Sequence, residues 1–180
     1  LLVSSVGEYN KAQSELETPN IIDCKQIELR NRPLGEPTEP TYHGALKMKK
    51  ALNKVKNRDI VLLKKQYKNG EYESYDNGIK SLCSDFRKIV EQGIETDLLC
   101  KIVTRFGYSV NTLRLKYLYA VTRSDIDLFN NMMTKYSAYE HSQSTERPVG
   151  LPELSDIERD VDDLISWCDD FGKRRNEIDK

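Results

Sequence analysis

The sequence predicts an all-α fold, an irregular bundle of about six to seven helices with an extended N-terminal arm and a C-terminal amphipathic helix. Apolar residues recur at spacings of three and four over most of the chain beyond residue 42, the period of a helix with one buried face. Glycine or asparagine separates these patterns at short intervals, as tight turns between helices require. Hydrophobic residues make up 38% and charged residues 32% of the 180 residues, so a core can form beneath a heavily charged surface.

Residues 1–41 are expected to form an N-terminal arm that is not part of the helical core. Three prolines and a glycine between residues 31 and 41 make that stretch a stiff linker, and residues 21–29 before it fit a short strand or an extended arm. The chain has no initiator methionine, and its first six residues are too short for a signal-peptide core. We therefore interpret it as a processed product or a fragment of a larger intracellular protein of the cytoplasm or nucleus.

The helical core is expected over residues 42–140, where the apolar period places six helices. Gly93 and Gly107 are expected to end the third and fourth of these helices, and Asn69–Gly70 the second. Asn57 interrupts the pattern between the first two without a glycine or proline, so one bent helix and two separate helices remain alternatives. The expected helices cover residues 45–55, 57–67, 79–90, 96–106, 109–122 and 124–136.

A linker over residues 141–154, rich in serine, threonine, proline and glycine, is expected to precede an amphipathic helix over residues 155–172. Ser155 and Glu158 have the spacing of a capping box, in which each side chain bonds the backbone N–H of the other, and Gly172 follows the expected end. The apolar stripe of this helix suits the groove of a partner protein, or packing onto its own domain or a second copy. Its candidate partner-binding residues are Ile157, Val161, Leu164, Ile165, Trp167 and Phe171.

The sharpest local pattern is LCKIVTRFGYSVNTLRLKYL, over residues 99–118. It combines an apolar first helix, a glycine at the turn, a small polar cap and an apolar residue inside the second helix. Residues 104–114 thereby resemble the helix-turn-helix of bacterial and phage DNA-binding proteins. The resemblance implies that Val110, Asn111 and Arg114 face a major groove, with Arg105 and Lys116 near phosphates. The residues that carry it are Ile102, Gly107, Ser109 and Leu113.

The same residues also fit an ordinary corner of the core. The helix expected over residues 109–122 carries Leu113, Leu115, Tyr117 and Leu118, so it is apolar around much of its circumference. Such a helix is usually buried on more than one side, whereas a recognition helix must present a polar face to the groove. The composition of this helix therefore favours burial in the core.

Charge is distributed unevenly although the net charge is only −1. Residues 47–68 hold nine basic residues and one acid, residues 99–123 hold five basic residues and no acid, and residues 153–180 hold ten acids and five basic residues. A basic middle and an acidic end permit contact with nucleic acid, docking of the tail on its own chain, or pairing between copies. The candidate nucleic-acid contacts are Arg105, Asn111, Arg114, Lys116, Lys49, Lys50 and Lys54.

No sequence pattern of an enzyme stands out. The chain lacks a glycine-rich phosphate loop, a nucleophile elbow and a His-Glu-x-x-His helix, so we predict no catalysis and no cofactor. The four cysteines fit small buried hydrophobes, and with two histidines we predict no metal site. No apolar run is long enough for membrane insertion. The prediction is a non-catalytic protein–protein interaction or oligomerisation module that binds another protein or a second copy of itself, with nucleic-acid binding as the alternative.

Overall fold

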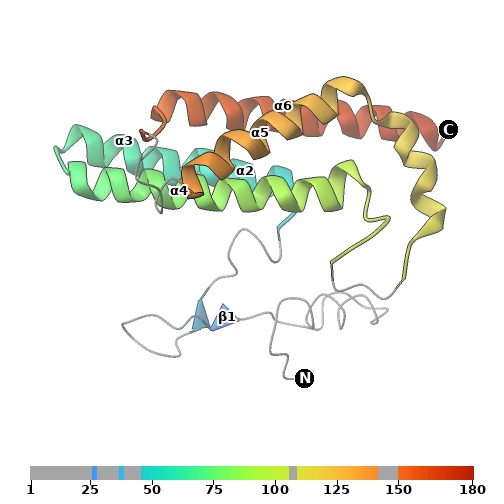
Figure 1. Cartoon of the computed structure of the whole chain (residues 1–180), viewed down its shortest axis with the longest axis horizontal. Coiled ribbons are helices and arrows are strands. Elements are labelled where there is room, and N and C mark those ends of the chain that lie inside the picture. Colours follow the sequence, from blue (N-terminus) through green and yellow to red (C-terminus); the bar gives the residue numbers. More distant parts are fainter. Residues whose placement is uncertain (1–25, 28–36, 39–45, 106–108, 142–149) are drawn as a thin grey trace.

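Four helical stretches lie side by side in the computed structural model, which describes residues 26–27, 37–38, 46–105, 109–141 and 150–180 (Figure 1). Successive stretches run in opposite directions, which is the up-down-up-down arrangement of a helical bundle. The all-α prediction is confirmed, although the described residues form five α-helices and not six to seven. These are α2 (Met48–Lys54), α3 (Val61–Lys68), α4 (Tyr72–Gly93), α5 (Arg123–His141) and α6 (Leu154–Ile178).

Three further helical segments and two short strands complete the described residues. A π-helical segment, η1 (Val55–Ile60), joins α2 to α3, and a second one, η2 (Ile94–Leu98), extends α4. A 3₁₀-helix, η3 (Thr112–Ala120), precedes α5. The strands β1 (Gln26–Ile27) and β2 (Pro37–Thr38) pair antiparallel. The rest of the predicted N-terminal arm lies outside the described residues.

The first helical stretch is continuous from α2 to α3. Lys54 and Val61, at the two ends of η1, both keep right-handed helical dihedral angles, so Asn57 widens the helix without ending it. Of the two alternatives, one bent helix or two separate helices, the structure contains one helix formed by α2, η1 and α3. It ends at Asn69 and Gly70, as predicted, and Gly70 adopts the positive φ of 78° that favours glycine at such a turn.

The α-helix α4 ends at Gly93, as predicted, but this glycine serves packing and does not stop the helical path. Gly93 has helical dihedral angles, and the chain continues through it into η2. A Cβ placed at Gly93 would lie 2.1 Å from the Sδ of Met48, a fully buried residue of α2. The missing side chain therefore lets α2 approach α4 closely.

The same substitution at two helical glycines is expected to have opposite effects. Gly93→Ala should lower the free energy of unfolding by about 1–2 kcal/mol, because overlap with Met48 outweighs the better helix propensity of alanine. Gly172→Ala should raise it by about 0.5–1 kcal/mol, because a Cβ there meets no atom within 4 Å. Urea denaturation followed by circular dichroism measures both. Equal effects at the two sites, or an unchanged cost of Gly93→Ala in a Met48→Ala background, would contradict this explanation.

The segment after η2 departs most from the predicted helices. Of the helix expected over residues 96–106, only residues 96–98 are helical, as the end of η2, and residues 99–105 form turns and bends. Cys100 and Lys101 adopt positive φ angles of 50° and 56°, which take the chain out of the right-handed helical path. The Thr96 hydroxyl, at the start of the expected range, donates to the Gln92 carbonyl inside the preceding helix.

The last helix is longer than predicted at both ends. It starts at Leu154, without a side-chain cap, and continues past Gly172 to Ile178. The predicted capping box of Ser155 and Glu158 is wrong, because the Glu158 carboxylate pairs instead with Lys64 of α3, at 2.6 Å. The predicted start of α5 at Ser124 is off by one residue, with the helix beginning at Arg123.

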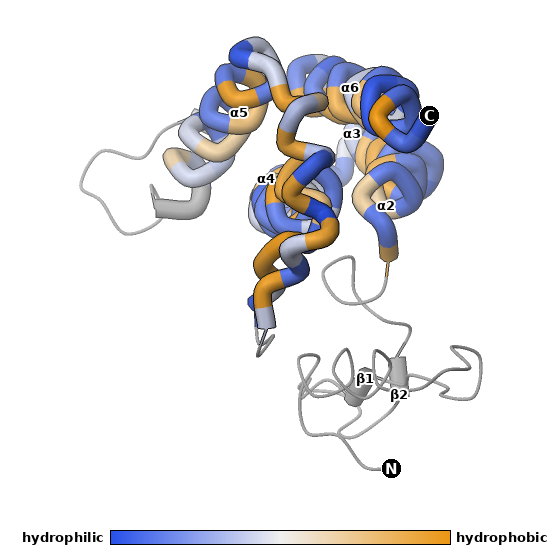
Figure 2. Tube along the Cα trace, turned by 90° about the vertical axis from the view of Figure 1, so that its right-hand side faces the viewer, coloured by the Kyte–Doolittle hydropathy of each residue, from blue (hydrophilic) through white to orange (hydrophobic). Residues whose placement is uncertain are grey.

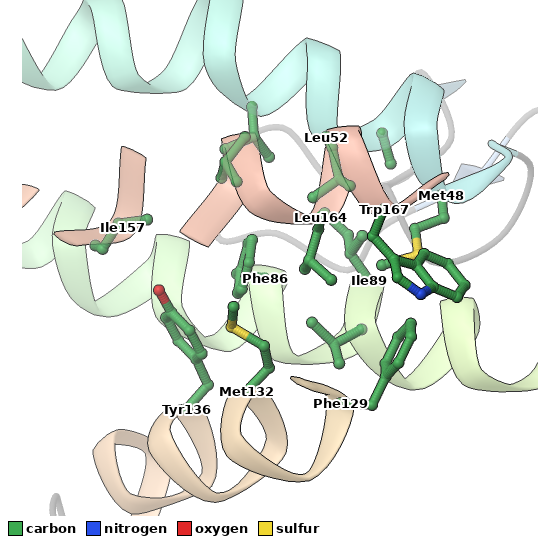
Figure 3. Close-up of a cluster of buried hydrophobic side chains, with 14 of the residues drawn as sticks. Met48, Leu52, Phe86, Ile89, Phe129, Met132, Tyr136, Ile157, Leu164 and Trp167 are labelled. Carbon is green, nitrogen blue, oxygen red and sulfur yellow. The ribbon is translucent and has the colours of Figure 1, made fainter. Parts of the chain in front are cut away.

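All four helical stretches contribute to one hydrophobic core (Figure 3). Phe86 of α4 contacts Tyr136 of α5, with ring centroids 4.4 Å apart. Phe129 of α5 meets the edge of Trp167 of α6 at 4.7 Å, and Trp167 stacks on Phe171 at 4.8 Å. Aromatic residues of α4, α5 and α6 therefore pack against one another within the core, with Trp167 beside Met48 of α2 (Figure 3).

Candidate interaction surface

The stripe predicted to bind a partner packs inside this chain. Five of its six residues are buried in the core, and Ile165 is half-buried against it. Of the possibilities that the sequence left open, packing onto the chain's own helices is the one the structure contains. A partner could reach this stripe only by displacing α6. The five buried residues are Ile157, Val161, Leu164, Trp167 and Phe171.

Much of the lysine-rich surface is paired with the acidic tail helix. Because α6 runs antiparallel to the first stretch, three lysines meet three acids in reverse order along it. Each pair is partly exposed and contributes about 0.2–1 kcal/mol, so the row specifies how α6 docks more than it stabilises the fold. Lys50 is exposed and Lys54 half-buried beside this row. The pairs are Lys49–Asp169, Lys56–Asp162 at 2.6 Å and Lys64–Glu158 at 2.6 Å.

The predicted helix-turn-helix is wrong in the described residues. Its first helix is replaced by turns over residues 99–105, and its second is the 3₁₀-helix η3. The three basic residues of this unit that were assigned to nucleic acid contact their own chain, and Asn111 is exposed beside them. Arg105 pairs with Glu95 at 3.0 Å, Arg114 donates to the Cys100 carbonyl at 3.1 Å, and Lys116 pairs with Asp179 at 2.6 Å.

Only one side of η3 packs on the bundle. A 3₁₀-helix has three residues per turn, so residues 114, 117 and 120 form one side, and these are the partly or fully buried positions of the segment. The Tyr117 hydroxyl donates to the Asp179 carboxylate at 3.0 Å. The Ala120 carbonyl accepts a hydrogen bond from Arg174 at 2.7 Å. These contacts fix η3 beside the last turns of α6, at one end of the bundle (Figure 1).

The other two sides of η3 present apolar residues to solvent. We call this surface the η3 face and define it by Leu113, Leu115, Leu118 and Tyr119. Leu113 is 85% and Tyr119 90% exposed. In Figure 2, which views this end of the molecule, hydrophobic residues of the segment lie in front of the bundle. The expected burial on more than one side is therefore wrong, because the 3₁₀ period turns only every third side chain inward.

A buried carboxylate anchors the junction behind the η3 face. Asp125, near the start of α5, accepts hydrogen bonds from the Thr122 backbone N–H at 2.7 Å and from the Trp167 indole at 2.7 Å. The Arg174 guanidinium binds both of its oxygens, at 2.7 and 2.9 Å. Burial alone raises the pKa of Asp125, but the hydrogen bonds from Arg174, Thr122 and Trp167 outweigh it and hold this pKa below its ordinary value.

Sequence reasoning missed this carboxylate although a signal for it was present. Thr122 and Asp125 have capping-box spacing, and the Asp125 backbone N–H donates to the Thr122 hydroxyl in return, at 3.3 Å. The predicted capping box at Ser155 had the same spacing without the contact. The roles of Trp167 and Arg174 in the cluster depend on the packing of α6, which no local pattern encodes.

A second buried polar group joins the C-terminal half of α5 to the second turn of α6. The Asp160 carboxylate accepts hydrogen bonds from the Tyr136 hydroxyl at 2.7 Å and from Lys135 at 2.6 Å. Burial raises the pKa of Tyr136, and its bond to Asp160 raises it further. Burial also raises the pKa of the Cys83 and Cys168 thiols to about 12, so both stay protonated at neutral pH. The Tyr136 hydroxyl therefore stays protonated at neutral pH as well.

Comparisons of the chain with protein-family models, with curated proteins and with solved structures find no match. In the part of the chain that the structure describes, no helix has the length and apolar character needed to cross a membrane. No three histidine, cysteine or acidic side chains gather there as a metal site. The η3 face is an exposed apolar surface that the packing of the described residues does not explain.

Proposed function

We propose that the protein is a non-catalytic helical protein–protein interaction or assembly module and that the η3 face is its contact surface. The observation that carries this proposal is the exposure of three leucines and a tyrosine in one short segment. Contiguous exposed apolar patches are uncommon on monomers and are characteristic of interaction sites. Tyrosine among aliphatic side chains is also common at the energetic centre of interfaces.

The contacts behind the η3 face support the same proposal. Tyr117 and Lys116 hold the middle of η3 to Asp179, and Ala120 is held to Arg174. A surface fixed in this way loses little conformational entropy when a partner binds, which favours affinity. The arrangement suits a preformed docking site.

The nucleic-acid alternative has less support. Arg105 and Lys116 would each have to leave a carboxylate of their own chain before neutralising a phosphate. Lys49 is in the same position, since it is paired with Asp169. We therefore put forward protein interaction alone as the function.

Substitution within the η3 face tests the proposal. Leu113→Asp places a charge in the face without touching the buried side of η3, and Leu62→Asp makes the same change at an exposed leucine of α3. Complexes formed by the wild-type chain, with itself or with proteins of its source cells, should be lost with Leu113→Asp and kept with Leu62→Asp. Sedimentation velocity and co-purification measure this. Complexes that survive Leu113→Asp would rule out the η3 face as the contact surface.

A further inference from the structure

We infer that the η3 face binds the η3 face of a second copy, which gives a symmetric dimer. This inference rests on the proposed function and names the partner. In a two-fold dimer the same patch meets itself, so the patch must be complementary to its own chemistry. An apolar surface with balanced charge meets this condition, whereas a surface of one sign does not.

Two cations at the face are paired with acids of the same chain, and a third, Arg114, donates to the Cys100 carbonyl. Lys116, which lies between Leu113 and Tyr119, is neutralised by Asp179 at 2.6 Å. At the end of η3 nearest α5, Arg123 pairs with Asp127 at 3.1 Å. Two copies can therefore approach without a large like-charge penalty, and a strongly acidic partner would gain little from cations that are already paired.

The arrangement of the apolar residues also fits pairing with itself. Leu113 and Tyr119 are six residues apart, which is two turns of a 3₁₀-helix, so they lie on the same side of η3. If two copies of η3 pack antiparallel, Leu113 of one meets Tyr119 of the other, twice by symmetry. Leu115 and Leu118 widen this contact on the adjoining side. Homodimer interfaces are more apolar than transient interfaces, and the η3 face consists of three leucines and a tyrosine.

Figure 1 shows η3 at one end of the bundle, beside the C-terminus, away from the α3–α4 turn. Leu62 of α3 is half exposed yet lies on a different part of the bundle, so it provides a matched control.

The test is the oligomeric state of the full chain and three variants. Sedimentation equilibrium over about a hundredfold range of concentration should show a dimer for the wild type, with Leu113→Asp raising its dissociation constant by about 100-fold. Asp179→Asn, which leaves Lys116 without its acid, should raise it by about tenfold, because two uncompensated lysines then meet. Leu62→Asp should leave it unchanged. Circular dichroism melting establishes that each variant is folded.

A wild-type monomer throughout, or a dimer unaffected by Leu113→Asp, would overturn the inference. Binding of an environment-sensitive apolar dye then separates it from the proposed function. A monomer that binds the dye through the η3 face, and loses it with Leu113→Asp, overturns the second copy as partner but leaves an interaction surface in place. A monomer that binds no dye there overturns both.

Discussion

Asp125→Ala is expected to lower the free energy of unfolding by about 3–5 kcal/mol, the usual cost of removing one partner of a buried ion pair. Asp125 and Trp167 are only 4% and 7% exposed, so water does not readily replace the hydrogen bond between them. The substitution leaves the Trp167 indole N–H, the Thr122 backbone N–H and much of the Arg174 guanidinium without an acceptor. Chemical denaturation of the two proteins measures the difference.

Asp127→Ala, two residues along the same helix, is the control. Its carboxylate pairs with Arg123 at the surface, so its loss should cost less than about 0.5 kcal/mol. A similar cost for Asp125→Ala would mean that the buried cluster does not stabilise the junction between η3, α5 and α6.

The dependence of stability on pH gives a second test of how Asp125 contributes to the fold. Its folded-state pKa lies below the unfolded value of about 3.9, so its contribution is fully present above that value and is lost as the pH falls below it. The free energy of unfolding of the wild type should therefore fall more steeply than that of Asp125→Ala between about pH 4 and about pH 2, the interval below the unfolded-state pKa. Parallel curves would contradict the lowered pKa.

Trp167→Ala is expected to cost about 3–5 kcal/mol of unfolding free energy, as large-to-small changes of buried aromatic residues do. Trp167 packs against Phe129 and Phe171 and donates its indole N–H to Asp125. A residue reserved for an external partner would instead leave the stability of the isolated chain unchanged. Denaturation followed by circular dichroism, which does not rely on tryptophan fluorescence, distinguishes these outcomes.

Trp167→Phe separates packing from hydrogen bonding at this position. It keeps a ring between Phe129 and Phe171 but removes the donor to Asp125, so it should cost less than the alanine variant, about 1–3 kcal/mol. A cost equal to that of Trp167→Ala would assign the whole effect to the indole N–H.

The long helices could be predicted from the sequence because burial on one face imposes a visible period. Phe86 and Ile89 of α4, and Val161 and Leu164 of α6, are fully buried, as their spacing indicates. The same spacing could not say which surface would bury the α6 stripe. That choice depends on contacts between residues far apart in the sequence, such as Trp167 with Phe129.

The region between α4 and α5 could not be predicted from local patterns. Glycine is the residue type that commonly ends a helix, but Gly93 also provides a packing contact with Met48, which lies more than forty residues away in the sequence. Cys100 and Lys101 adopt positive φ angles that neither residue type favours, so no local pattern in the sequence predicts the turn. Once the chain turns there, η3 meets α6 along one side only, and its apolar composition ceases to indicate burial.

The row of pairs between the lysines of the first stretch and the acids of α6 has a consequence for how the protein is made. Lys49 and Asp169 are separated by 120 positions in the chain, so this contact forms late and at a high cost in loop-closure entropy. Until α6 has left the ribosome, Leu52 and Phe86 lack the apolar cover that α6 provides. During synthesis the first three helical stretches therefore expose hydrophobic side chains that the complete core would bury. The nascent protein is prone to aggregation until α6 packs over them.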